Sequence, residues 1–393
     1  MRRAGGFAFI ALLLLAFLLG LLATRLSSSP PAPTRVSDRP RDRDHAAEAI
    51  KQVRQELASA YYREVPESVL LEPSINEILR ELEDPYTDYL TPSEYAALKT
   101  RTARSYSGVG LTVSPSRRGL LVTSTFGGPA REAGIRRGDV IVRIQGRPAG
   151  ALSFEQSLSL ITGEKGTLVR LTVKRERQGT IHFALVRQEI DAPSLRSHVV
   201  KVRGASHGYV RLHTFRADTA ERLERAVRRL VRGGAKGVIV DLRGNPGGLI
   251  SQAIASVSLF VDEAVVCTTS GLHQNRRVFR TSGESRFPRV PLVILVNAGS
   301  ASAAEIVAAA LKEHGRAVIV GRRTFGKASV QSVRPLANGG ALKLTTATYR
   351  TPNGRDLAER GVRPSVRAHD DPRTRADEAL ARAQQTLFSL FRT

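Results

Sequence analysis

Three short apolar runs, each ending in a loop of small and polar residues, constrain the fold of this chain more than any other part of its sequence. The runs are Lys236–Leu242, Val290–Val296 and Ala317–Val320. Runs this short and apolar are typical of strands buried on both faces of a sheet. Patterns of helical period at Leu249–Phe260 and Ser302–His314 separate them. The alternation predicts an α/β core with a parallel-type sheet and flanking helices.

Further elements are expected around this core, and the sequence places them before and after the three runs. They are a strand at Gly208–Leu212, a helix at Asp218–Arg232, a loop around Cys267–Arg280, a hairpin of Gln331–Leu336 with Ala341–Tyr349, and a final helix at Arg373–Phe391. The turn Asn338-Gly339-Gly340 between the two hairpin strands supports that pairing.

The loops that follow the three buried runs are unusually rich in small and polar residues. They span Asp241–Gly248, Asn297–Ser302 and Gly321–Lys327. In open α/β sheets, sites lie beyond the carboxyl ends of the strands. We therefore expect the three loops to meet in space and to form a site.

A serine and a lysine in these loops suggest nucleophilic catalysis. Serine is a poor nucleophile unless a base contacts it. None of the eight histidines lies in the three loops, and His213 and His314 have ordinary structural explanations at a strand edge and a helix end. A lysine can serve as the base of a serine nucleophile. The Asn297–Ser302 loop holds two serines, Ser300 and Ser302. Ser302, which starts a helix, is the candidate partner of Lys327, and Ser300 is the alternative.

For this chemistry Lys327 must be neutral part of the time, so its pKa must fall from about 10.4 toward neutrality. The neighbouring Phe325 and Ala328 predict an apolar setting, and Arg322 and Arg323 are candidates for the like charge. Gln331 could hold the lysine nitrogen if the strand turns tightly, since an amide adds no charge.

Two other interpretations compete with this pair. Gly321–Lys327 fits the G-x-x-x-x-G-K pattern of a phosphate-binding loop, but Ala328 follows where a Ser or Thr should bind magnesium. Ser302 and Glu305 also spell the capping box S-x-x-E, which would make Ser302 only a helix cap. A nucleophile at a helix start is nevertheless well placed, because the N–H of Ala303 can bind an oxyanion.

Composition limits the function classes. The formal net charge of +24 suits nucleic acid or anionic lipid. The arginines, however, are spread over every segment, and the aromatic content of 5% offers few bases a stacking platform. We therefore expect no nucleic-acid partner. The single cysteine, Cys267, excludes an intramolecular disulfide and a cysteine-rich metal site.

The N-terminus predicts membrane attachment. Arg2 and Arg3 precede the uncharged, mostly apolar run Ala4–Thr24, which has about the 20 residues that a spanning helix needs. No clear cleavage site follows, so residues 1–26 are predicted as a retained signal anchor. Positive charge before the run keeps the N-terminus in the cytoplasm. The body would then lie on the periplasmic face of the inner membrane, after a linker at 27–44.

Two regions separate the linker from the core. Residues 45–103 have apolar residues at helical spacing, with an N-cap and first-turn proline at Thr91-Pro92. Residues 104–192 change to short strands and glycine turns, and their order, with PAREAGIRRGDVIVRIQG in the middle, resembles a PDZ domain. The resemblance implies a peptide groove in which backbone N–H groups of Gly108, Val109, Gly110 and Leu111 hold a terminal carboxylate. Taken alone, Gly108 and Gly110 could also be turn glycines.

The succession of motifs resembles a carboxyl-terminal processing (tail-specific) serine protease. The motifs are DPYTDYLTPSEY, the PDZ-like region, VIVDLRGNPGGL, GSASAAEI and RTFGKASVQ, in that order. The resemblance implies Ser302 as nucleophile, Lys327 as general base, Gln331 orienting the lysine, and an oxyanion hole of Gly248 and Ala303. Gly247 is an alternative to Gly248. It also implies a crotonase-like α/β protease core that needs no metal or cofactor.

The sequence thus predicts a serine endopeptidase that captures exposed C-terminal tails of exported or unfolded proteins. Its core would span 193–370, followed by a C-terminal helix at 371–393. The alternative is a non-catalytic PDZ scaffold that binds C-terminal peptides in the periplasm. The oligomeric state is open, although the terminal helical regions could pair subunits in a homo-oligomer.

Overall fold

The computed structural model describes residues 40–102, 106–152, 154–191, 194–202, 204–370, 374 and 376–391. The expected signal anchor, residues 1–26, and most of the expected linker lie outside this range. The first helix, α2 (Pro40–Ala60), begins inside the stretch predicted as linker. Over the described residues, no helix has the length and apolar character needed to cross a membrane.

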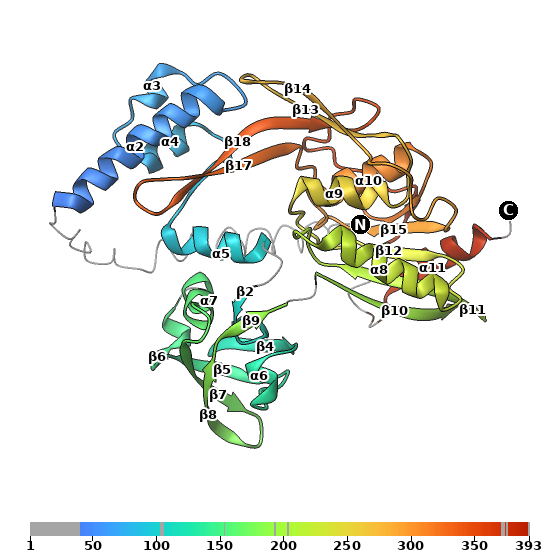
Figure 1. The fold of residues 1–393 in the computed structure, drawn as a ribbon, viewed down its shortest axis with the longest axis horizontal. Coiled ribbons are helices and arrows are strands. Elements are labelled where there is room, and N and C mark those ends of the chain that lie inside the picture. Colours follow the sequence, from blue (N-terminus) through green and yellow to red (C-terminus); the bar gives the residue numbers. More distant parts are fainter. Residues whose placement is uncertain are drawn as a thin grey trace, which may run out of the picture.

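The core contains one six-stranded sheet in the order β10-β11-β12-β15-β16-β19 (Figure 1). Its strands are β10 (Leu195–Val202), β11 (Ala205–Leu212), β12 (Val238–Asp241), β15 (Leu292–Val296), β16 (Val318–Gly321) and β19 (Val366–Arg367). The pairs from β11 to β19 are parallel, and β10 pairs antiparallel with β11. The sequence patterns indicated the four inner strands and missed the two edge strands.

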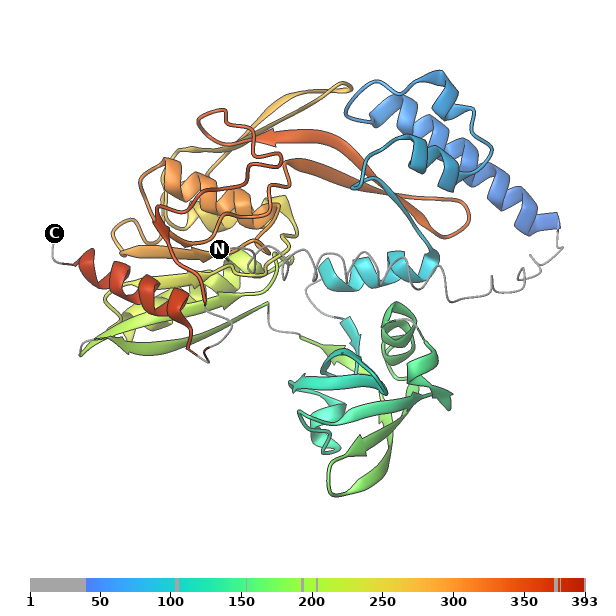
Figure 2. The same cartoon turned by 180° about the vertical axis from the view of Figure 1, so that it is seen from behind.

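Helices cover both faces of this sheet, which explains why its inner strands are apolar throughout. Helices α8 (Thr219–Arg232), α9 (Ile250–Ser258) and α10 (Ala303–Glu313) pack against one set of alternate strand residues. Helix α11 (Glu378–Ser389) packs against the other set, on the opposite face (Figure 2). Because side chains alternate along a strand, each strand contributes to both layers.

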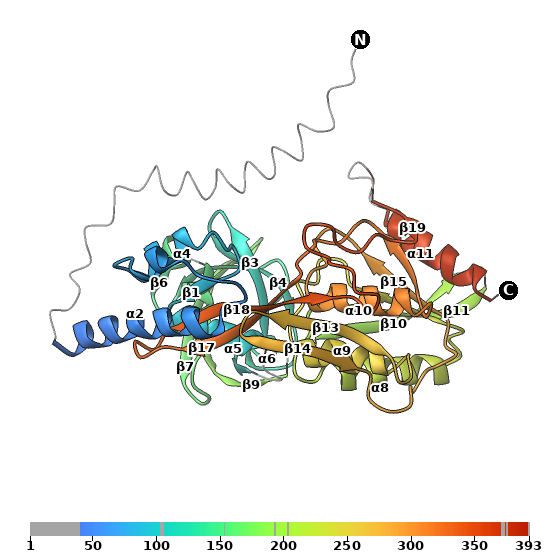
Figure 3. The same cartoon turned by 90° about the horizontal axis from the view of Figure 1, so that it is seen from above.

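A second, antiparallel sheet connects the core to the N-terminal region (Figure 3). It contains β1 (Asp88–Leu90), β13 (Val265–Gly271), β14 (Gln274–Arg280), β17 (Ser329–Pro335) and β18 (Ala341–Arg350). The predicted hairpin β17–β18 is confirmed. The loop expected around Cys267–Arg280 is wrong, because this segment forms the hairpin β13–β14 and β13 also pairs with β18.

The N-terminal region packs on the far end of this sheet. Helices α2, α3 (Glu67–Leu70) and α4 (Ile75–Glu81) share a hydrophobic cluster with Leu342 and Leu344 of β18. The helix predicted after Thr91 is confirmed as α5 (Pro92–Thr102), with Pro92 at its first position. Thr91 and Glu94 exchange hydrogen bonds of 2.8 and 3.3 Å through their backbone N–H groups, as in a capping box.

The PDZ region forms its own six-stranded sheet and core. Its elements are β2 (Tyr106–Gly108), β3 (Leu111–Ser116), β4 (Gly119–Thr125), α6 (Pro129–Glu132), β5 (Val140–Ile144), β6 (Arg147–Pro148), η1 (Ala149–Ala151), α7 (Phe154–Ile161), β7 (Leu168–Arg175), β8 (Gly179–Val186) and β9 (Gln188–Ile190). β2 and β9 pair with each other where the chain enters and leaves the region. Helix α7 and the antiparallel hairpin β7–β8 complete the region.

One histidine is buried without a polar partner where α11 ends. His207, on β11, is fully buried, and over the described residues neither ring nitrogen has a hydrogen-bond partner. Its ring stacks on Phe391, with centroids 5.4 Å apart. Burial lowers the pKa of His207, because an imidazolium there would be a charge without an acceptor. The folded state therefore favours neutral His207.

We expect His207 to weaken the fold in acid. An unfolded histidine has a pKa of about 6.5, so below that pH the unfolded chain binds a proton that folded His207 rejects. The loss begins as the pH falls through about 6.5 and grows with further acidification. Thermal melts between about pH 7.5 and 5 should therefore show a shallower pH dependence for His207→Leu than for wild type. The exposed-site control His273→Leu should follow wild type, and equal slopes for both variants would contradict the prediction.

Candidate active site

Ser302 occupies the turn between β15 and α10 in a strained backbone conformation. It is the N-cap of α10, with φ 55° and ψ −119°. A residue with a side chain rarely adopts such angles, which cost about 1–3 kcal/mol and occur preferentially at functional sites. The sequence placed Ser302 at a helix start but could not predict this strain.

A buried carboxylate, Glu305, connects the Ser302 turn to the loop that carries Lys327. Its Oε2 accepts the backbone N–H of Ser302 and of Lys327, each at 2.9 Å. Its Oε1 accepts the N–H of Gly326 at 2.7 Å and the hydroxyl of Thr324 at 2.6 Å. Glu305 is fully buried, and burial raises its pKa, whereas these four hydrogen bonds oppose that rise. The sequence identified Glu305 only as a helix cap.

The predicted capping box is present, and it coexists with the candidate site. Ser302 and Glu305 form the box at the start of α10. A hydroxyl has one proton to donate and two lone pairs to accept, so a serine in this position still has a proton for a base. The cap and the nucleophile are therefore compatible roles for Ser302.

Lys327 lies partly buried between β16 and β17. Burial, followed by the positive charge of Lys343, lowers the pKa of Lys327 to about 8. Its Nζ lies 5.0 Å from the ring centroid of Tyr86, which belongs to the N-terminal region. Asp84 and Glu305 act in the opposite direction and favour the charged lysine.

The expected source of the like charge is wrong. Arg322 and Arg323 are exposed, and neither contributes to the shift of Lys327. Phe325 is 56% exposed, so it does not supply the expected apolar cover. The nearby cation is Lys343, on β18, which approaches through sheet pairing rather than through the local sequence.

Gln331 does not make the expected contact with the lysine. Its side-chain amide donates to the Ser329 hydroxyl at 2.8 Å and to the Thr345 hydroxyl at 3.5 Å. The register of β17 with β18 shifts between Val330 and Gln331. A different residue bridges the two loops: the Tyr349 hydroxyl donates to the carbonyl oxygens of Lys327 and, at 3.4 Å, of Ser302.

The loop after β12, residues 241–248, is called the glycine loop below, and it packs directly against Ser302. A Cβ on Gly247 would lie 2.8 Å from the Ser302 Cβ, so only glycine fits there. The Gly247 N–H is used by the Asn245 side chain at 2.8 Å. In contrast, the N–H groups of Gly248 and Ala303 donate no hydrogen bond within the described part of the chain. This favours Gly248 over Gly247 as the partner of Ala303.

The glycine loop and the serine loop are also connected to each other. The Ser300 hydroxyl is buried and donates to the Leu242 carbonyl at 2.8 Å, which gives this second serine a structural role. The Asn245 carbonyl accepts the N–H of Ala301 at 2.9 Å. The three loops at the carboxyl ends of the strands therefore meet, as the sequence predicted.

Comparison with known proteins decides the family. The carboxy-terminal processing protease CtpA of Bacillus subtilis is 32% identical over 327 residues, which are 83% of this chain and 69% of that protein. Residues 206–368 match peptidase family S41, and residues 126–175 match the PDZ domain. The chain belongs to peptidase family S41. The chain is therefore a serine peptidase of mixed α/β fold with a PDZ domain.

Two further relatives support the assignment to S41. The carboxyl-terminal-processing protease of Synechocystis is 36% identical over 296 residues, 74% of this chain and 69% of that protein. The solved structure of the photosystem II D1 C-terminal processing protease superposes with a TM-score of 0.54 at 30% identity, covering 86% of this chain and 96% of that one.

A cavity of about 640 Å³ connects the PDZ region of this S41 peptidase to its core. Val109, Leu111 and Leu158 line it from the PDZ region, and residues of α5 line it from the N-terminal region. Pro246 of the glycine loop and Lys343 line it from the core. The cavity is mostly apolar at the PDZ end and reaches the cation that acts on Lys327.

The four predicted PDZ residues have different roles in this region. Gly110 has φ 81°, and a Cβ there would lie 2.7 Å from a backbone oxygen, so its glycine is required by the turn. Gly108 pairs with Gln188 of β9. Val109 and Leu111 face the cavity.

Among the described residues of the S41 peptidase, no group of three or more His, Cys, Asp or Glu side chains could hold a metal ion.

We predict that Glu305→Gln loosens the site. The amide keeps the size of the carboxylate but turns one acceptor into a donor facing backbone N–H groups. Leaving such groups unpaired should lower the free energy of unfolding by about 1–3 kcal/mol, as measured by denaturant titration. Glu313→Gln on the same helix is a matched control, since Glu313 accepts only one backbone N–H, that of Asn353 at 2.8 Å. Equal losses in the two variants would argue against the central role of Glu305.

Proposed function

We propose that this S41 peptidase cleaves peptide bonds with Ser302 as nucleophile and Lys327 as general base. The observation that carries the proposal is a partly buried lysine of lowered pKa, whose backbone N–H binds the same carboxylate as the backbone N–H of Ser302. At a pKa of about 8, part of the lysine population is neutral at neutral pH and can accept a proton.

The proposed reaction has two halves. Neutral Lys327 Nζ takes the hydroxyl proton of Ser302 while Oγ attacks the substrate carbonyl carbon, and the N–H groups of Gly248 and Ala303 bind the resulting oxyanion. The lysinium then protonates the leaving amine as the peptide C–N bond breaks, which leaves an ester on Ser302. In the second half, neutral Lys327 deprotonates a water that attacks the ester carbonyl carbon. As the C–O bond to Ser302 breaks, the lysinium returns this proton to Oγ, which restores the serine and the neutral lysine.

Gln331 has an indirect place in this scheme. Its amide donates to Ser329, the first residue of β17, and to Thr345 on β18, so it supports the start of β17. Tyr349 supports the carbonyl groups of both proposed catalytic residues. We assign orientation of the dyad to these two side chains together.

We further propose that the substrates are proteins with exposed or unfolded C-terminal tails. The similar proteins are named as C-terminal processing proteases, and the PDZ region offers an apolar groove at Val109 and Leu111. Addition of a tail beside β3 would use backbone N–H groups near Gly108 and Gly110 for its carboxylate. The shared cavity then leads toward the glycine loop.

We propose a crotonase-like protease core, in keeping with the parallel strands and alternating helices. We propose that residues 1–26 anchor the protein in the inner membrane, with its body in the periplasm, from the apolar run Ala4–Thr24 and the charges before it. No observation favours the non-catalytic scaffold.

Removal of either member of the dyad should abolish proteolysis. Ser302→Ala and Lys327→Ala should each lower the hydrolysis of an unfolded casein by at least about a thousandfold, because nucleophile and base act as a unit. A fluorophosphonate should label wild type and not Ser302→Ala. Thermal melts check that both variants remain folded. Full hydrolysis by a folded Ser302→Ala protein would refute the assignment.

The pH dependence should report Lys327. The base must be neutral, so kcat/KM should rise with pH through about 8. Lys343→Gln removes a like charge, which favours protonated Lys327, so the rise should move to higher pH. Lys312→Gln, at a partly exposed lysine that donates to the Arg363 carbonyl, is the matched control and should leave the profile in place. A profile unchanged by Lys343→Gln would exclude that lysine as the cause.

A further inference from the structure

An arginine near the start of the glycine loop, Arg243, is surrounded by carboxylates. Arg243 is the second residue after β12, and its side chain is only 12% exposed. Its Nε and Nη2 donate to Asp241, a fully buried residue, at distances down to 2.8 Å. Asp241 also accepts from Arg211 at 2.6 Å and from the Tyr209 hydroxyl at 2.8 Å. The negative charge of Asp241 is therefore balanced by Arg211 and Arg243, without any contact from the C-terminal region.

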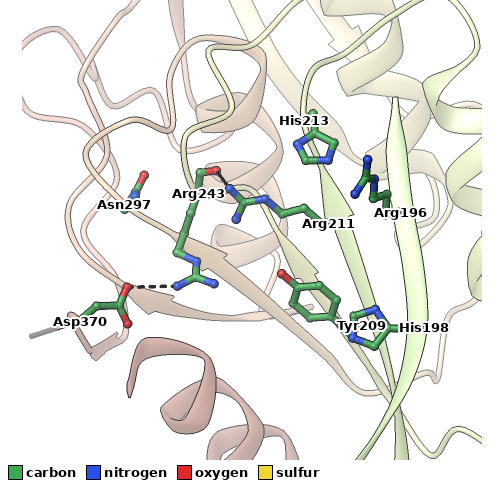
Figure 4. Close-up of a pocket in the computed structure, with 8 residues that line it drawn as sticks. All are labelled: Arg196, His198, Tyr209, Arg211, His213, Arg243, Asn297 and Asp370. Atoms are coloured by element: carbon green, nitrogen blue, oxygen red, sulfur yellow. Dashed lines mark hydrogen bonds and ion pairs between the residues drawn. The ribbon is translucent and has the colours of Figure 1, made fainter. Parts of the chain in front are cut away.

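The other side of Arg243 is bound by the C-terminal region. Asp377, the N-cap of α11, accepts from Nη1 and Nη2 of Arg243 through its two oxygens, both at 2.8 Å. Asp370 accepts from Nη1 at 3.2 Å (Figure 4). A bidentate arginine–carboxylate pair fixes orientation as well as distance. The start of α11 is thus bound to the glycine loop through the ion pair between Asp377 and Arg243.

The residues that flank Arg243 connect this ion pair to the loop that carries Ser302. Leu242 accepts the Ser300 hydroxyl, and the Gly244 N–H donates to the Asn297 side chain at 2.8 Å. The Arg243 carbonyl accepts from Arg211. A shift of Arg243 would therefore move both the loop that ends in Gly248 and the loop that ends in Ser302.

We propose that Asp377 is a positioning residue for peptide hydrolysis, acting through Arg243 on the oxyanion hole. This inference rests on the proposed roles of Ser302 and of the Gly248 N–H. Helix α11 contributes to catalysis by holding the glycine loop, in addition to covering the sheet residues Ile239, Val293 and Leu295. Two of the three carboxylates around Arg243 come from beyond the core strands, so the loop is complete only when this segment is docked.

The substitution Asp377→Asn separates helix capping from the ion pair. Asparagine is as good an N-cap as aspartate, so the hydrogen bond from the Leu380 N–H at 2.8 Å can be kept. The charge toward Arg243 is lost. Asp241 and Asp370 still hold the arginine, so we expect a fall in kcat of about tenfold, smaller than the roughly hundredfold cost of a 1 Å misplacement in an active site.

The experiment compares full-length wild type, Asp377→Asn and Asp377→Glu in casein hydrolysis. The expected result is a lower kcat with unchanged KM and unchanged melting temperature for Asp377→Asn, and partial recovery with Asp377→Glu. Fluorophosphonate labelling of Ser302 should slow in parallel. Because salt weakens a partly exposed ion pair, high ionic strength should narrow the gap between wild type and Asp377→Asn. Glu224→Gln, which removes the ion pair to Arg228 on α8, is the control and should retain wild-type kcat.

Three results would overturn the inference: an unchanged kcat for Asp377→Asn, a change confined to KM, or a loss of activity explained entirely by a smaller folded fraction. Failure of the underlying mechanism looks different. Were Ser302→Ala active, the dyad itself would be refuted. An inactive Ser302→Ala protein together with a fully active Asp377→Asn protein would refute only the role of Asp377.

Discussion

The hydrogen bonds of the Glu305 carboxylate are the interactions on which the rest of the candidate active site depends. This carboxylate accepts four hydrogen bonds in a fully buried position, three of them from the backbone of two different loops. An unpaired carboxylate there would be very costly, so each donor must stay in place. This requirement fixes the positive φ of Ser302 and the approach of Lys327 in a single arrangement. One helix residue thereby converts two separate strand ends into one site.

The sequence predicted those parts of the molecule that local pattern determines. The buried strands, the helix after Ser302 and the meeting of three loops follow from apolar runs and from the rule for carboxyl ends of strands. The sequence did not predict which cation lowers the pKa of Lys327. Its neighbours Arg322 and Arg323 face solvent, whereas Lys343 lies on β18 and comes close through strand pairing. Local sequence likewise could not show that a register shift before Gln331 would direct its amide to Ser329. Contacts between distant strands decide such details.

The N-terminal region contributes more to the site than its sequence suggested. Its segment after α4 brings the ring of Tyr86 to Lys327, and Asp84 holds this turn by accepting from the Tyr86 N–H and the Thr87 hydroxyl. Thr87 in turn accepts the N–H of Thr345 on β18. The long hairpin β17–β18 therefore carries the lysine at one end and the N-terminal helices at the other. The partial burial of Lys327 therefore results from packing of the N-terminal region against the hairpin β17–β18, two segments far apart in the chain.

The grip of Asp377 on Arg243 spans 134 residues of sequence. A chain made from its N-terminus presents Ser302 and Lys327 before Asp377, so both proposed catalytic residues are exposed to solvent and to neighbouring chains earlier than their last support. The order of synthesis therefore separates the presence of the reactive groups from their final alignment. With Asp377 in its proposed role, a nascent chain would remain a weak enzyme after Ser302 and Lys327 have been made and would gain full activity only when helix α11 docks.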